Sequence, residues 1–96
     1  MEEIDIALPP TRGEIAEHID RAIRSIANLR TASRGTLKTL PGSIHWHLKF
    51  ADEPGTLELT YWPATKRLWF KIHPRRRADW MDDVMKTLTR NLTRAP

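Results

Sequence analysis

The chain has 96 residues, which suits one domain, and its net charge of +4 reflects 16 Lys and Arg against 12 Asp and Glu. Cysteine is absent, which excludes disulfides, thiolate metal sites and a cysteine nucleophile, and we expect a cytoplasmic location. No apolar run approaches the roughly 20 residues that span a bilayer, and the acidic start MEEIDIALPP is unlike a secretory signal, so we expect no membrane partner.

The charges are unevenly distributed along the chain. Residues 1–20 contain six acids and one base, whereas residues 21–51 contain six bases and no acid. Residues 66–77 contain another six bases without an acid. A basic field of this kind favours polyanionic partners and speeds their association.

The first part of the chain predicts a helix. Residues 1–10 form an N-terminal segment in which Ile4, Ile6 and Leu8 alternate, so this segment is a candidate edge strand. Residues 11–33 are predicted to be helical, because Thr11 and Glu14 fit a capping box. Apolar residues then recur at helical spacing: Ile15, Ile19, Ala22, Ile23, Ile26 and Leu29. Gly35 is the expected stop signal, and the following loop is expected to tuck Leu37 and Leu40 onto the domain.

Residues 43–73 predict a three-stranded antiparallel meander. The segments SIHWHLKF, TLELTYW and RLWFKIH each alternate apolar and polar residues with a period of two. The connections ADEPG and PATK are short and rich in turn residues. Neighbouring strands joined by such short turns run antiparallel.

The register follows from keeping the apolar sides together, because a slip of one residue would turn a strand's apolar side to water. The predicted pairs of the first hairpin are Phe50–Leu57, Leu48–Leu59 and Trp46–Tyr61; those of the second are Tyr61–Leu68, Leu59–Phe70 and Leu57–Ile72. The opposite face would then contain the rows Lys49–Glu58–Lys71, His47–Thr60–Trp69 and His45–Trp62–Arg67.

Residues 74–93 predict a second helix that starts at Pro74. Its apolar stripe consists of Met81, Val84, Met85, Leu88 and Leu92. Each helix has one apolar stripe and the sheet has one strongly apolar face. We therefore predict an α+β fold in which both helices pack on one face of the sheet and the other face stays open.

The predicted helix–strand–strand–strand–helix order resembles that of double-stranded-RNA-binding domains, which also place basic residues at their second helix, where this chain has Arg75–Arg77. The motifs differ. The loop between the first two strands reads ADEPG instead of Gly-Pro-x-His, and the helix start reads RRRADW instead of Lys-Lys-x-Ala-Lys. The resemblance is therefore one of topology, and the chain is not assigned to that family.

The open face suggests a binding surface. Trp62 and Trp69 are expected to be exposed there among His45, His47, Arg67 and Lys71, close to Arg75, Arg76 and Arg77. Aromatic rings among cations can stack nucleobases while the cations hold phosphates. The sequence thus predicts a small non-enzymatic module that binds nucleic acid through these nine residues.

Two other interpretations of the same face remain open. Tryptophans on a sheet face also contribute large contact areas to symmetric homodimers or to interfaces with other proteins. Alternatively, the N-terminal segment or the loop of residues 34–43 could cover Trp62 and Trp69, which would make both rings part of the interior.

The sequence gives little indication of catalysis or of a cofactor. The three serines, Ser25, Ser33 and Ser43, are not in a nucleophile-elbow context, and the four glycines are scattered. His45 and His47 lie about 6.6–7 Å apart along one side of a strand and could share a metal ion if Glu58 or His73 supplied a third ligand. The predicted register opposes this, because it places Glu58 beside Lys49 and Lys71 and His73 far from the other histidines. We therefore predict neither enzyme activity nor a metal site.

Overall fold

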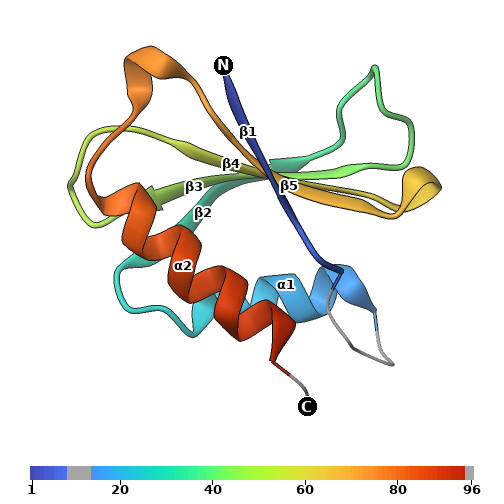
Figure 1. Cartoon of the computed structure of the whole chain (residues 1–96), viewed down its shortest axis with the longest axis horizontal. Helices are drawn as coiled ribbons and strands as arrows, with labels where there is room; N and C mark the ends of the chain where they lie inside the picture. The colour runs from blue at the N-terminus through green and yellow to red at the C-terminus, as the bar shows by residue number, and fades with distance from the viewer. Residues whose placement is uncertain (9–13, 95–96) are drawn as a thin grey trace.

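The computed structural model describes residues 1–8 and 14–94, which form an α+β fold with two helices and a five-stranded antiparallel sheet (Figure 1). The strands are β1 (Glu2–Ile6), β2 (Leu29–Gly35), β3 (Ile44–Phe50), β4 (Leu57–Trp62) and β5 (Arg67–Ile72). The helices are α1 (Ile15–Arg24) and α2 (Trp80–Thr93), and the short 3-10 turns η1 (Pro63–Thr65) and η2 (Pro74–Arg76) flank β5. The order of strands in the sheet is β1-β5-β4-β3-β2.

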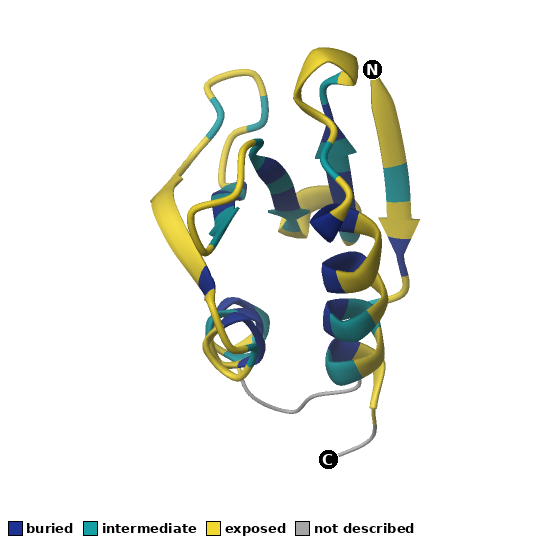
Figure 2. Cartoon of the chain, turned by 90° about the vertical axis from the view of Figure 1, so that its left-hand side faces the viewer, coloured by how far each residue is buried: buried dark blue, intermediate teal, exposed yellow. Residues whose placement is uncertain are grey.

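Both helices pack on one face of the sheet, and the hydrophobic core lies between the two layers (Figure 2). The core is built from alternate, apolar residues of the strands and from one stripe of each helix. Its largest fully buried side chains are Trp46, Phe70, Ile19, Ile23, Leu48, Leu57, Leu59, Leu68, Ile72, Met81, Leu88 and Leu92. Burial of each such side chain contributes about 1.5–3 kcal/mol to the free energy of folding.

The first helix is shorter than predicted, and a strand follows it. Helix α1 ends at Arg24, where Ser25 donates a hydrogen bond to the carbonyl of Ala22 and continues into a turn. Asn28 has a φ of 69°, a left-handed conformation through which a right-handed helix cannot continue, and β2 starts at Leu29. The prediction of one helix over residues 11–33 is wrong, because residues 29–35 form β2, whose inward-facing backbone groups pair with β3. Thr11 of the expected capping box lies outside the described residues.

The candidate N-terminal strand corresponds to β1, which pairs antiparallel with β5 at one edge of the sheet. Strand β2 forms the opposite edge, and both edge strands are largely exposed (Figure 2). The order of elements is therefore β-α-β-β-β-β-α instead of helix, three strands and helix. The topological resemblance to double-stranded-RNA-binding domains does not hold for this fold.

The register of the second hairpin is as predicted for Tyr61–Leu68 and Leu59–Phe70. The first hairpin is shifted by two residues, because Leu48 pairs with Leu57 and Trp46 with Leu59. Strand β3 extends beyond β4, and Phe50 pairs with Leu29 on β2 instead of with Leu57. The ring of Phe50 also stacks on Trp80 of α2, with 5.6 Å between centroids, so this end of β3 is held by β2 and α2.

The second helix begins six residues later than predicted. Residues Pro74–Arg76 form the separate turn η2, and Arg77 has an extended backbone before α2 starts at Trp80. Arg75 to Arg77 therefore belong to the connection between β5 and α2 and not to the first turn of the helix. Within the described part of the chain, neither helix is long and apolar enough to cross a membrane.

Candidate functional site

The face of the sheet opposite the helices brings together polar side chains from three strands. In the observed register His47 of β3 is opposite Glu58 of β4, which is in turn opposite Lys71 of β5. The next row contains His45, Thr60 and Trp69. The predicted rows of this face are wrong for β3, because the two-residue shift moves both histidines toward Glu58.

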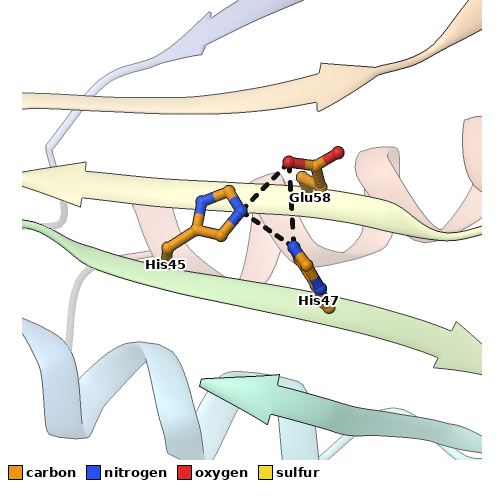
Figure 3. A group of neighbouring side chains, drawn as sticks. All are labelled: His45, His47 and Glu58. Carbon is orange, nitrogen blue, oxygen red and sulfur yellow. Dashed lines mark hydrogen bonds and ion pairs between the residues drawn. The ribbon is translucent and has the colours of Figure 1, made fainter. Parts of the chain in front are cut away.

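His45, His47 and Glu58 form a compact cluster on this face (Figure 3). The Nε2 atom of His45 lies 3.0 Å from Oε1 of Glu58 and 3.0 Å from Nε2 of His47. The Nε2 atom of His47 is 3.9 Å from the same carboxylate oxygen. Three atoms that can act as metal ligands therefore converge on one point. The metal site that the predicted register opposed is geometrically available.

Two neighbouring residues, Thr60 and His73, contact members of the cluster. The hydroxyl Oγ1 of Thr60 lies 2.6 Å from Nδ1 of His45, so the other ring nitrogen of His45 faces the cluster. The Nε2 atom of His73 lies 2.6 Å from Oε2 of Glu58, on the side of the carboxylate away from the other histidines. Among the described residues, His73 thus contacts Glu58 but is not one of the three converging donors, which agrees with its predicted separation from the other histidines. Glu58, on the central strand β4, therefore contacts His45 and His47 on one side and His73 on the other.

The cluster is partly buried, and this burial changes the pKa of His45. The side chains of His45 and Glu58 are 10% and 13% exposed, whereas that of His47 is 44% exposed. Burial lowers the pKa of His45 below its ordinary value of 6.5, and the charge of His47 acts in the same direction, although Glu58 opposes both. His45 is therefore neutral at pH 7, with one ring nitrogen free to act as a ligand.

Of the two lysines predicted to lie beside Glu58, the register confirms Lys71 and contradicts Lys49. The Nζ atom of Lys49 donates a hydrogen bond to the carbonyl of Gly55 at 3.0 Å. Lys71 is the cross-strand neighbour of Glu58, and its charge is one of the influences that lower the pKa of His45. Within residues 1–8 and 14–94, however, every ion pair of Glu58 is with a histidine.

The two tryptophans of this face are less exposed than the predicted stacking surface requires. Trp69 is only 4% exposed, and the guanidinium of Arg67 lies 4.1 Å from its ring centroid. Trp62 is half-buried and donates a hydrogen bond from Nε1 to the carbonyl of Pro41. The connection between β2 and β3 therefore covers this end of the face, as one of the three interpretations expected, with Leu37 and Leu40 lining the same hollow as both rings.

Two of the four arginines that were predicted to bind phosphate form ion pairs with acidic residues. Arg67 binds Glu3 and Asp5 of β1, at 3.1 and 2.7 Å. Arg77 binds Glu2 and Asp82, both at 2.6 Å. The other two, Arg75 and Arg76, are exposed and form no ion pair with any described residue.

The cluster was partly visible in the sequence. The pattern His-x-His on one strand, with an acid on the next, is its only sequence signal, and the choice of register decided whether the residues meet. Neither the family models, nor the curated proteins, nor the solved structures contain a match to this chain.

Proposed function

We propose that this protein binds a divalent transition-metal ion of the zinc class through Nε2 of His45, Nε2 of His47 and the carboxylate of Glu58. Imidazole nitrogen and carboxylate oxygen are ligands that zinc and related ions accept in proteins. Three protein ligands leave a fourth position for water or for another ligand.

The spacing of the three donor atoms is the observation that carries this proposal. Ligands that surround zinc tetrahedrally at 2.0–2.2 Å lie about 3.3–3.6 Å from one another. The corresponding separations here are 3.0, 3.0 and 3.9 Å. Small side-chain rotations thus suffice to place all three donors at bonding distance from one ion.

The outer contacts also match what metal ligands require. A histidine ligand usually donates its second ring N–H to an oxygen, and a ligating carboxylate is itself hydrogen-bonded. Thr60 supplies the first contact, to Nδ1 of His45, and His73 supplies the second, to Oε2 of Glu58. These contacts fix the orientation of two of the three ligands before an ion arrives.

Zinc titration by calorimetry tests this proposal. We expect one saturable site in the wild-type protein, and a loss of affinity of at least about 100-fold in His47→Ala and in Glu58→Gln, because the loss of a ligand costs more than the 10–100-fold typical of an outer contact. His18→Ala is the matched control, since His18 contacts the carbonyl of Leu92 in the helical layer. Absence of saturable binding, or equal affinity in the Glu58→Gln variant, contradicts the proposal and favours a purely structural ion-pair cluster.

Nucleic-acid binding is the second candidate, and it is supported by the exposed cations Arg75 and Arg76. Because Trp69 is covered, phosphate contacts would carry most of such binding, with Trp62 at the margin. A homodimer through this face would likewise lose the aromatic area of Trp69. For nucleic acid, log affinity is expected to fall with log salt by about 0.7–0.9 per phosphate contact. Affinity that is independent of salt rules out this candidate.

A further inference from the structure

We propose that the metal site and the cations beside it form one composite site, which binds a phosphate group in a metal-dependent way. This inference rests on the proposed metal site and specifies the class of ligand that the fourth metal position takes. It requires that the cations lie next to the metal ligands, that they are free, and that their chemistry suits phosphate.

His73 connects the cations to the metal ligands, because it contacts the ligand Glu58 and precedes the arginines on the chain. Its Nε2 atom contacts Glu58, and the same residue lines a hollow of about 410 Å³ with Pro74, Arg75 and Arg76. A second hollow of about 240 Å³ shares both arginines and adds Lys49. Lys49 is two residues from His47 on β3, so its side chain emerges on the same face of the sheet.

The charges around these hollows are available to a ligand. Arg75 and Arg76 are exposed, and no described acid pairs with either. Lys49 makes one hydrogen bond, to the carbonyl of Gly55, and keeps its charge and two further N–H donors. Arg77 lines the smaller hollow, but Glu2 and Asp82 already occupy its guanidinium.

The chemistry of the two groups fits different oxygens of one phosphate. A phosphate oxygen can occupy the fourth position of a zinc-class ion, while guanidinium groups donate paired hydrogen bonds to the remaining oxygens. The ion would also offset the negative charge of Glu58 that otherwise faces the ligand. A mononucleotide and a polynucleotide backbone share this phosphate chemistry, and the two are separated by experiment.

Linkage makes the proposal measurable, because a phosphate that strengthens metal binding must itself bind more tightly when the metal is present. Calorimetry would measure the zinc affinity of the full chain without any added probe. The measurement would then be repeated in the presence of uridine 5′-monophosphate, of an eight-residue oligothymidylate, and of uridine. We expect the mononucleotide or the oligonucleotide to raise the zinc affinity at least about 5-fold, the lower end of typical coupling. Uridine, which lacks the phosphate, should have no effect.

The double variant Arg75→Ala/Arg76→Ala should keep its zinc affinity and lose this gain. Arg21→Ala/Arg24→Ala, which removes the same charge from exposed positions of α1, should keep both. A gain with the mononucleotide identifies a small phosphorylated ligand, and a gain with the oligonucleotide alone identifies a polynucleotide; both outcomes support the proposal.

Three other outcomes overturn it. If zinc binds but neither phosphate probe changes its affinity, this inference fails while the metal site stands. If the gain persists in the Arg75→Ala/Arg76→Ala variant, the arginines have no part in it. If zinc does not bind at all, both proposals fail.

Discussion

The indole Nε1 of Trp46 donates a hydrogen bond of 2.8 Å to Oδ1 of Asp20, which ties the interior of the sheet to helix α1. Trp46 is fully buried, so its N–H has no access to water. The other oxygen of Asp20 lies 3.7 Å from the guanidinium of Arg34, which is also 5.6 Å from the Trp46 ring centroid. One carboxylate thus connects α1 with β3 and with the edge strand β2.

Asp20→Ala should destabilise the protein by about 1–3 kcal/mol, because it leaves a buried N–H donor without a partner. Urea denaturation followed by circular dichroism measures this loss in the free energy of unfolding. Glu17→Ala is the control, since Glu17 is exposed on the same helix and should change stability by less than about 0.5 kcal/mol. If Asp20→Ala costs as much in a Trp46→Phe background as in the wild type, the hydrogen bond is not the cause.

Gly55 occupies a position that tolerates no side chain. Its φ is +97°, and an added Cβ would lie 2.7 Å from the carbonyl oxygen of Arg76 and 2.7 Å from Cε of Met81. Gly55→Ala should therefore destabilise the protein by at least about 1–3 kcal/mol through backbone strain alone, with the contact to Arg76 adding to this cost.

Gly35→Ala is the matched control for Gly55. An added Cβ at Gly35 meets no atom within 4 Å, and its φ is not in the left-handed region. This variant should be neutral or more stable by about 0.4–1 kcal/mol, because alanine reduces the freedom of the unfolded chain. Equal stability of the two variants in urea denaturation would contradict both the backbone strain and the close contacts at Gly55.

Thr60 is expected to position His45 for metal binding. Thr60→Val keeps the volume of a side chain that is 1% exposed but removes the oxygen that lies 2.6 Å from Nδ1 of His45. The zinc affinity should fall about 10–100-fold, as for other outer contacts of metal ligands. Thr60→Ser should restore it, because serine keeps the hydroxyl. A Thr60→Val protein that is folded and binds zinc like the wild type contradicts this role.

Periodicity predicted much of the meander and the stripe of the second helix. Leu68, Phe70 and Ile72 alternate with Trp69 and Lys71, and this pattern placed the first three correctly in the core. The short connection between β4 and β5 leaves little choice of register, so the pairing of Tyr61 with Leu68 was also correct. Local signals thus sufficed for the register of β4 and β5 but not for that of β3 and β4.

The candidate site could not be predicted in the same way. A two-residue slip between β3 and β4 leaves every side chain on its own face, so alternation cannot distinguish the predicted register from the observed one. The slip decides whether His47 is opposite Glu58 or Thr60. In the observed register Phe50 pairs with Leu29 on β2, a strand that the helical spacing of Ile26 and Leu29 concealed.

The connection between β2 and β3 covers Trp69, and tryptophan quenching tests whether this ring is shielded from solvent. Trp46, Trp69 and Trp80 are buried and Trp62 is half-buried, so Trp62 should account for most of the emission that acrylamide quenches. Acrylamide is suitable because it is neutral and Arg67 does not attract it. Trp62→Phe should remove most of the quenchable fraction, whereas Trp69→Phe should leave it unchanged. If Trp69→Phe removes as much as Trp62→Phe, the connection does not cover Trp69, and both rings are available for stacking on the open face.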